Sequence, residues 1–464
     1  MNGLEPGVTA AGDAGTITPR DALVAPAARL RGSLTLPGDK SISHRALMLA
    51  MLARGESRIA RAGDGGDVRS SAAIAAALGA TVERSLNDDG TADYRVVSPG
   101  ADGLRQPATT LDCGNSGTSL RLFAGILAGL PLTSVLDGDE SLRRRPVARI
   151  IEPLRSMGAV LRARDGDSRP PLTVVGRSPL RGIDHVARVP SAQVKSAILL
   201  AGLRAEGWTS VSESVATRDH TERMLRARGV PVRRDVAPDG AVKVGLEGGA
   251  DVQAIDERVP GDVSAAAFWL VAGSIHPDAQ LTIAGVGLNP TRRAIVDLLR
   301  AMGAVIDERA NGRKGSSEDD GVGEPAADLT VRSAELRAID VGPADVAAAI
   351  DEIPILCLSA TQARGTTRIR GAGELRHKES DRIAGIAAGL AALGARISVD
   401  GDDITIDGPT PLRGAATDSL DDHRLAMTFA VAGLIATGST AVARSSSAAV
   451  SYPAFFVDLE RIGS

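Results

Sequence analysis

The stretch Ala77-Leu78-Gly79-Ala80-Thr81-Val82 predicts the end of an apolar helix followed at once by a strand. Glycine accepts the left-handed backbone that ends many helices, and β-branched residues behind it favour a strand. The pattern recurs at Ser156-Met157-Gly158-Ala159-Val160-Leu161, Ala227-Arg228-Gly229-Val230-Pro231-Val232, Ala301-Met302-Gly303-Ala304-Val305-Ile306 and Ala392-Leu393-Gly394-Ala395-Arg396-Ile397. A truncated copy, Arg461-Ile462-Gly463, closes the chain. The repeat therefore predicts six α/β units.

The spacing of these copies predicts how the units are grouped. Their glycines are 79, 71, 74, 91 and 69 residues apart, which is too long for a solenoid repeat. A chain of 464 residues also exceeds one ordinary core, so two domains of three units each are expected. The turn Val259-Pro260-Gly261-Asp262 lies near the midpoint, where we expect the crossover between domains. The one long interval contains residues 308–327, whose Gly, Ser, Asp and Lys content predicts a disordered insertion.

Composition argues against several classes of protein. Aromatic residues make up 2% of the chain and the net charge is −4, whereas nucleic-acid binders are usually basic and use aromatic stacking. Cys113 and Cys357 stand in apolar surroundings and are expected to be reduced core residues, and the histidines lack metal-ligand spacing. No apolar run approaches the length of a membrane span. Residues 1–26 lack the pattern of a secretory signal, which favours a flexible tail on a cytoplasmic protein.

Residues suited to binding an anion are concentrated where the expected helices begin. Leu36-Pro37-Gly38-Asp39-Lys40-Ser41-Ile42-Ser43-His44-Arg45 combines a tight turn, two cations and the start of an Ala/Leu/Met-rich helix, a combination that suits a phosphate or carboxylate. Taken alone, an ordinary helix cap with solvated charges would explain it. A nucleotide-binding loop would need a Gly-Lys pair, but Asp39 separates Gly38 from Lys40.

The same arrangement of capping residues and a cation precedes five more apolar helices. These starts are Asn115-Ser116-Gly117-Thr118-Ser119-Leu120-Arg121, Ser191-Ala192-Gln193-Val194-Lys195, Asn289-Pro290-Thr291-Arg292-Arg293, His377-Lys378-Glu379-Ser380-Asp381-Arg382 and Asp421-Asp422-His423-Arg424. Helix capping alone explains one such start. Six in one chain predict a site for a heavily anionic ligand, assembled from many helix N-termini.

From about Ala27 to its end, the chain resembles the 5-enolpyruvylshikimate-3-phosphate synthase family. The resemblance rests on residues 36–45 and on motifs that occur in the family's order: Gly114-Asn115-Ser116-Gly117-Thr118, Arg145-Pro146, Ser191-Ala192-Gln193, Asp351-Glu352-Ile353-Pro354, Lys378-Glu379-Ser380-Asp381-Arg382 and Asp422-His423-Arg424. It implies two inverse α/β-barrel-like domains, each of three βαβαββ units, joined by a double-crossover hinge. The first strand would belong to the second domain, giving bounds of 27–39 plus 260–464 for one domain and 40–259 for the other.

The reaction implied is transfer of the enolpyruvyl group of phosphoenolpyruvate to the 5-hydroxyl of shikimate 3-phosphate, with release of phosphate. The two substrates carry two phosphates and two carboxylates, so several cations must surround one water-poor cleft. A base must take the hydroxyl proton and an acid must protonate the vinyl carbon. The resemblance implies no cofactor, no metal and no macromolecular partner, a monomer, and closure of the two domains around the substrates.

Family roles transfer to matching positions of this chain. The implied phosphoenolpyruvate contacts are Lys40, Gly117, Arg121, Arg145, Gln193, Arg382 and Arg424. The implied shikimate 3-phosphate contacts are Lys40, Ser41, Arg45, Ser191, Ala192, Gln193, Arg218, Asp351 and Lys378. Asp351 would deprotonate the 5-hydroxyl and Glu379 would carry the proton to the vinyl carbon, with Lys40 as the third catalytic residue.

Two positions depart from the family pattern. Val450 replaces a lysine that many relatives place before the Ser/Thr-aromatic-Pro motif, and Glu374 replaces an asparagine. The pattern Arg218-x-His220-x-Glu222 resembles the branch called class II. Glyphosate inhibition is also implied, with Gly117 matching inhibitor-sensitive members rather than the alanine of tolerant ones.

Two other functions stay open at this point. UDP-N-acetylglucosamine enolpyruvyl transferase shares the fold and the donor, but its members have a Lys-Asn pair where this chain has Lys40-Ser41, and they use a cysteine in an acidic loop. A non-catalytic binder of shikimate phosphate or a phosphosugar would need no acid/base pair, so intact Asp351 and Glu379 argue against it.

Overall fold

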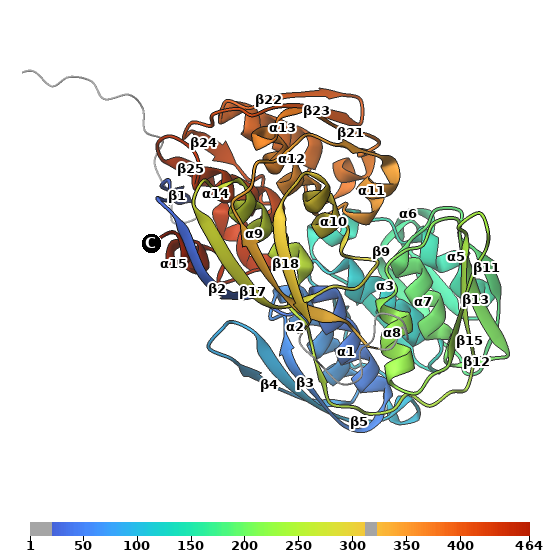
Figure 1. The fold of residues 1–464 in the computed structure, drawn as a ribbon. Helices are drawn as coiled ribbons and strands as arrows, with labels where there is room; N and C mark the ends of the chain where they lie inside the picture. Colours follow the sequence, from blue (N-terminus) through green and yellow to red (C-terminus); the bar gives the residue numbers. More distant parts are fainter. Residues whose placement is uncertain (1–20, 311–322) are drawn as a thin grey trace, which may run out of the picture.

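The computed structural model describes residues 21–310 and 323–464. Figure 1 shows two lobes, the first built from residues 40–259 and the second from the C-terminal half together with the first two strands. None of the helices in these described parts is long and apolar enough to cross a membrane.

The first lobe alternates helices and strands along the chain. Its elements are α1 (Lys40–Leu52), β3 (Arg54–Ala62), α2 (Gly66–Ala77), β4 (Thr81–Leu86), β5 (Ala92–Pro99), β6 (Leu111–Asp112), α3 (Gly117–Ala128), β7 (Thr133–Asp137), α4 (Glu140–Arg144), α5 (Ala148–Ser156), β8 (Val160–Ala163), α6 (Arg164–Asp167), β9 (Arg169–Val175), β10 (Leu180–Arg181), β11 (Asp184–Val186), α7 (Ala192–Gly202), β12 (Ala205–Glu206), β13 (Trp208–Glu213), α8 (His220–Ala227), β14 (Val232–Val236), β15 (Val242–Glu247) and β16 (Glu257–Arg258).

The second lobe repeats this order. Its elements are β1 (Ala22–Val24), β2 (Leu30–Thr35), α9 (Val263–Ile275), β17 (Ala279–Gly287), α10 (Ala294–Ala301), β18 (Val305–Ala310), β19 (Ala326–Arg332), β20 (Asp340–Val341), α11 (Pro343–Ala348), α12 (Ile353–Gln362), β21 (Gly365–Ile369), α13 (Arg382–Ala392), β22 (Arg396–Asp400), β23 (Asp403–Gly408), β24 (Ala416–Asp418), α14 (His423–Gly433), β25 (Thr440–Ala443) and α15 (Phe455–Gly463).

The sheets follow one repeating plan, which confirms the predicted α/β units. In the order β6-β7-β9-β8, the first pair is parallel and the other two pairs are antiparallel. With α3 and α5 as connections, this is a βαβαββ unit. The orders β16-β3-β5-β4, β11-β13-β15-β14, β18-β19-β17-β2 and β20-β21-β23-β22 repeat it, and the last unit has the three-stranded order β1-β25-β24.

The glycines of the repeat end their helices as predicted. Gly79, Gly158, Gly229, Gly303 and Gly394 all have positive φ, between 81° and 113°. This backbone is strained for other residues, so the glycine lets the chain leave each helix and start a strand.

Each lobe encloses helices that are rich in apolar residues and buried along most of their length. In the first lobe these are α1, α3 and α7, and in the second α9, α12 and α14. Their small residues permit close approach, since a Cβ at Gly125 of α3 would lie 2.2 Å from the carbonyl oxygen of Ala197 in α7. One buried apolar cluster spans residues 42–259, and the other joins residues 24–36 to residues 263–462.

The chain crosses between the lobes twice, and the two crossings lie side by side. Asp39 N–H donates to Pro260 O at 2.8 Å, Asp262 N–H donates to Pro37 O at 3.0 Å, and Gly38 forms a bridge with Gly261. Strand β2 pairs in parallel with β17 of the second lobe. We propose residues 27–39 plus 260–464 and residues 40–259 as the two domains on this basis.

Two predicted segments differ in the structure. The predicted tail, residues 1–26, includes β1, which pairs antiparallel with β25, because Val24 is buried against the second lobe. The predicted insertion, residues 308–327, overlaps the ordered ends of β18 and β19, where Glu308 to Ala310 pair with Ala327 to Leu329. Residues 1–20 and 311–322 lie outside the described part of the chain.

Candidate active site

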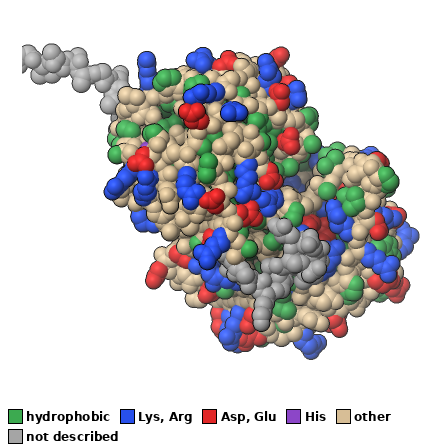
Figure 2. All heavy atoms as spheres, viewed as in Figure 1, with side chains coloured by type: hydrophobic (Ala, Val, Ile, Leu, Met, Phe, Trp, Pro, Cys, Tyr) green, Lys and Arg blue, Asp and Glu red, His purple; other side chains and the backbone are tan. Residues whose placement is uncertain are grey.

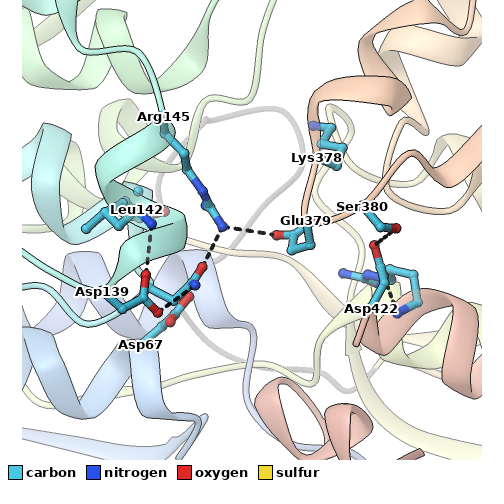
Figure 3. Close-up of polar contacts among 12 residues, drawn as sticks. Asp67, Asp139, Leu142, Arg145, Lys378, Glu379, Ser380 and Asp422 are labelled. Carbon is cyan, nitrogen blue, oxygen red and sulfur yellow. Dashed lines mark hydrogen bonds and ion pairs between the residues drawn. The ribbon is translucent and has the colours of Figure 1, made fainter. Parts of the chain in front are cut away.

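The predicted site residues meet between the two lobes, at the N-terminal ends of their helices. Lys40, Gly117 and Ala192 are the first residues of α1, α3 and α7, and Arg382 is the first residue of α13. Asp39, Ser116, Ser191, Asp381 and Asp422 each accept a backbone N–H with their side chain, as N-caps do. Figure 3 shows Arg145 of the first lobe pointing toward Glu379 of the second.

One of the six predicted helix starts does not reach the site. Helix α10 begins after Arg293, which accepts no capping bond through its side chain. The preceding Arg292 is buried and donates to Ser264 Oγ at 2.7 Å, next to Glu352. This arginine therefore neutralises a buried carboxylate near the crossover instead of facing a ligand.

Lys40 forms an ion pair with a residue that the sequence analysis did not identify. Its Nζ lies 2.9 Å from Asp67 Oδ2, in the first turn of α2. Burial alone would lower the pKa of Lys40, but Asp67 outweighs burial and raises it. An acidic residue directly after the pair Gly65-Gly66 was the available signal, because carboxylates favour helix N-termini. Lys40 is therefore a fixed cation.

Arg121 and Arg145 form a second group around Gly117. Arg121 Nη1 donates to Gln193 Oε1 at 2.6 Å, and Gln193 Nε2 donates to Thr118 Oγ1 at 3.1 Å. Burial, together with the like charges of Arg145 and Arg149, lowers the pKa of Arg121 to about 10. Two guanidinium groups held this close to a helix N-terminus form a strong site for an anion.

Arg382 lies at the centre of the second lobe's contribution. Its Nη2 is 2.6 Å from Glu379 Oε2, its Nε is 2.8 Å from Asp422 Oδ2, and its Nη1 is 3.5 Å from Asp351 Oδ1. Among the described residues, Arg382 Nη1 and Arg424 Nε are buried without a hydrogen-bond partner, as are donors of Arg204, Arg228 and Arg292. A bound anionic ligand would supply hydrogen-bond acceptors for the buried donors of Arg382 and Arg424.

Asp351 and Glu379 are held as carboxylates. Burial would raise the pKa of each, but Arg218, Lys378, Arg424 and Arg382 hold the pKa of Asp351 well below its usual value. For Glu379, Arg382 is the foremost of the cations that lower the pKa to about 2. Both groups are therefore ionised at neutral pH and able to accept a proton.

Two ion pairs join the lobes across the site. Arg218 Nη2 lies 2.8 Å from Asp351 Oδ2, and Arg145 Nη2 lies 3.9 Å from Glu379 Oε1. In Figure 2, the face shown carries mixed basic and acidic side chains over both lobes. Cations of the first lobe are therefore paired with carboxylates of the second lobe.

Two of the remaining predicted residues are Arg45 of the first lobe and Lys378 of the second lobe. Arg45 is 4% exposed and donates to Thr221 Oγ1 at 2.7 Å, to Ser41 O at 2.9 Å and to Ser196 Oγ at 3.0 Å. Lys378 lies 3.9 Å from Asp351 Oδ1 and 3.5 Å from Glu374 Oε1, so the departure at Glu374 places a carboxylate beside this lysine.

At the other departure from the family pattern, Val450, the structure shows a backbone contact and no charged side chain. A Cβ at Gly65 would lie 2.5 Å from the carbonyl oxygen of Val450, so the segment that lacks the family lysine packs directly on the start of α2. Besides Asp67, the sequence analysis left three site groups without a role: His423 beside Glu379, Asp422 on Arg382 and Asn115 on Arg145. All three lie within motifs quoted above, but no pattern in the sequence showed that their side chains face the site.

Other candidate features lie elsewhere or carry no reactive group. A cavity of about 530 Å³ is lined by Leu52, Ile126 and Leu203 near the C-terminal ends of α1, α3 and α7, away from the predicted site. Cys113 and Cys357 are buried and free, and burial raises the pKa of both thiols. Residues 21–310 and 323–464 hold no group of three His, Cys, Asp or Glu side chains placed to bind a metal.

Comparisons with known proteins agree on the family. Residues 24–459 match the model of EPSP synthase (3-phosphoshikimate 1-carboxyvinyltransferase). The 3-phosphoshikimate 1-carboxyvinyltransferase of Gloeobacter violaceus is 52% identical over 95% of this chain and 98% of its own length. That of an Anaeromyxobacter species is 50% identical over 93% and 96%.

Solved structures confirm the predicted fold. EPSP synthase from Acinetobacter baumannii superposes with a TM-score of 0.84 at 37% identity, covering 95% of this chain and 98% of that one. The enolpyruvyl transferase NikO from Streptomyces tendae has a TM-score of 0.74 at 21% identity, over 95% and 97%, and shows the fold alone. With its two lobes of three βαβαββ units and a match along nearly its whole length, the chain belongs to the EPSP synthase (3-phosphoshikimate 1-carboxyvinyltransferase) family.

Proposed function

We propose that the cleft between the lobes is where this chain carries out its family's reaction. That reaction transfers the enolpyruvyl group of phosphoenolpyruvate to the 5-hydroxyl of shikimate 3-phosphate and releases phosphate. The supporting observation is that Asp351 and Glu379 contact the same guanidinium, that of Arg382, while donors of Arg382 and Arg424 stay unbonded. Two ionised carboxylates beside unused cationic donors suit proton transfer on an anionic substrate.

Phosphoenolpyruvate is assigned to the cations nearest Glu379. Lys40, Arg145, Arg382 and Arg424 would bind its phosphate and carboxylate, with Arg121, Gln193 and the backbone N–H of Gly117 completing the site. Arg145 and Arg382 already reach Glu379 from opposite lobes, which supports a ligand held between them. Binding would then close the lobes further on the substrates.

Shikimate 3-phosphate is assigned to the side of the cleft formed by α7 and the loop before α8. Ser191, Ala192 and Gln193 lie at the start of α7, and Arg218 reaches Asp351. Lys40, Ser41, Arg45 and Lys378 would complete the site. This places the sugar ring between the two lobes, with its 5-hydroxyl beside Asp351.

Asp351 would then remove the hydroxyl proton as the oxygen attacks C2 of phosphoenolpyruvate. Glu379 would carry this proton to the vinyl carbon, giving a tetrahedral intermediate. As the C–O bond to phosphate breaks, Glu379 would take a proton back from the new methyl group, the double bond re-forms and the proton leaves with the phosphate. Lys40 would stabilise the leaving phosphate, and no step requires a metal or cofactor.

Four further properties are proposed. The pattern around Arg218 and His220 supports the class II branch. A site complete within one chain supports a monomer without a nucleic-acid partner, and two free, buried cysteines support the cytoplasm.

The test is phosphate release from phosphoenolpyruvate, measured with and without shikimate 3-phosphate. We expect release only with shikimate 3-phosphate, and none with UDP-N-acetylglucosamine as acceptor. Release with the nucleotide sugar would assign the chain to the other enolpyruvyl transferase, and binding without turnover would make it a binder.

A further inference from the structure

A fully buried lysine lies between two buried glutamates beneath the cleft. Lys195 Nζ is 3.0 Å from Glu213 Oε2 and 2.9 Å from Glu222 Oε1, and all three side chains are at most 2% exposed. They come from α7, the end of β13 and α8. The proposed reaction uses none of them.

Lys195 has a third contact within this cluster. Besides the two carboxylates, its Nζ donates to the carbonyl oxygen of Thr217 at 3.3 Å. Arg45, buried beside Glu222, supplies a second positive charge, so two cations balance two carboxylates. Although burial would lower the pKa of Lys195, the two glutamates raise it, so the lysine is charged.

Glu213 connects this cluster to two elements of the proposed shikimate 3-phosphate site. One carboxylate oxygen accepts the backbone N–H of Ser191 at 3.2 Å, and both oxygens lie 2.8 Å from Thr217 Oγ1. Thr217 directly precedes Arg218, so its hydroxyl and its carbonyl are both fixed at the base of the Arg218 loop. The start of α7 and this loop are thereby tied to one carboxylate.

Stability alone is a poor explanation for this arrangement. Removing charges from water costs several kcal/mol each, and apolar residues of similar volume are often as stable or more so. A buried charge cluster instead fixes the relative positions of the groups that it bonds.

We propose that Glu213 and Lys195 are positioning residues that hold Ser191 and Arg218 at the separation needed to bind the 3-phosphate of the acceptor substrate. This inference rests on the proposed function. It assigns to the cluster a role in the affinity for one substrate, separate from binding of phosphoenolpyruvate.

The first variant is Glu213→Gln, which keeps the shape of the side chain and leaves Lys195 paired with Glu222. A misplacement of about 1 Å in a binding group can cost about 100-fold, so we expect the KM for shikimate 3-phosphate to rise about 10- to 100-fold. The KM for phosphoenolpyruvate, measured at saturating shikimate 3-phosphate, should stay within about three-fold of wild type, since the cations proposed to bind it (Lys40, Arg145, Arg382 and Arg424) lie on other elements.

A matched pair at Thr217 tests the same connection with little risk to folding. Thr217→Val keeps the shape and removes the hydroxyl, whereas Thr217→Ser keeps the hydroxyl. Loss of one hydrogen bond should raise the KM for shikimate 3-phosphate about two- to ten-fold in the valine variant only. If Glu213→Gln does not fold, this pair decides the question.

Glu257→Gln is the control for a purely structural effect. Glu257 pairs with Arg228, which is 0% exposed, in the same lobe. This variant should lower the melting temperature and leave both KM values unchanged. The inference is overturned if Glu213→Gln and Thr217→Val only lower the melting temperature, or if both KM values rise together. Absence of shikimate 3-phosphate-dependent turnover in the wild type would instead overturn the proposed function.

Discussion

Replacing Gly117 with alanine should weaken glyphosate far more than phosphoenolpyruvate. A Cβ at this position would lie 2.7 Å from Arg121 Nη1 and 3.5 Å from Arg145 Nη1. The methyl group therefore meets the arginines of the proposed anion site. To reach ordinary contact at 3.4 Å, the Arg121 guanidinium must retreat by about 0.7 Å.

That retreat acts on a bond that holds the site together. Arg121 Nη1 donates to Gln193 Oε1 at 2.6 Å, and a hydrogen bond from a charged donor contributes about 1.5–3 kcal/mol. Glyphosate is a zwitterion longer than phosphoenolpyruvate, so it needs the full length of the site and should lose this stabilisation. Its inhibition constant should rise about 10- to 100-fold. The shorter substrate can shift and keep its ion pairs, so its KM should rise about three-fold at most.

The assay is inhibition of phosphate release by glyphosate at several phosphoenolpyruvate concentrations, in wild type and Gly117→Ala. Competitive inhibition is expected in both. Equal losses for the two ligands, or tighter inhibition in the variant, would show that Gly117 does not limit the space of this site. Arg121→Lys provides a control, because it disturbs the same bond to Gln193 without adding a methyl group.

Three other outcomes are expected. Asp351→Asn should slow the chemical step by roughly 100-fold or more with substrate binding retained, and near-normal single-turnover rates would show that another group is the base. Folding lowers the pKa of Glu379 from 4.5 to about 2. The ionised carboxylate therefore stabilises the folded protein fully above about pH 4.5, and this stabilisation is lost as the pH falls toward 2. Glu379→Gln should therefore lower the melting temperature at pH 7 by an amount that shrinks on acidification, and a difference that grew at low pH would contradict this assignment. Exhaustive chelation of divalent metals should leave turnover unchanged, and loss of turnover restored by one added metal would disprove the proposed metal-free mechanism.

Local signals predicted the repeat and most helix starts correctly. Gly79 and its counterparts end helices because the left-handed backbone they adopt is a local property, and caps such as Ser116 act within one helical turn. The same locality explains the errors. Strand β1 has only three residues, too few for a strand pattern to show in the sequence, so only its pairing with β25 reveals it.

The site was predictable in its residue types but not in its pairings. Motifs located Lys40, Asp351 and Arg382, yet the ion pair of Lys40 with Asp67 depends on how α1 and α2 pack. Arg292 shows the opposite case, since its motif resembled the others while its guanidinium turned toward Ser264. The spacing of residues along the chain does not show which lobe a side chain faces.

The pairing of β2 with β17 has a consequence for synthesis of the chain on the ribosome. Leu30 of β2 pairs with Ala279, 249 residues later in the sequence. At about 5–20 residues per second, β2 emerges roughly 12–50 s before its partner exists. During that time the whole of residues 40–259 can fold, while Leu30 and Leu34, both fully buried in the finished protein, remain exposed. The nascent chain therefore carries an unpaired strand with two exposed leucines until the second lobe is made.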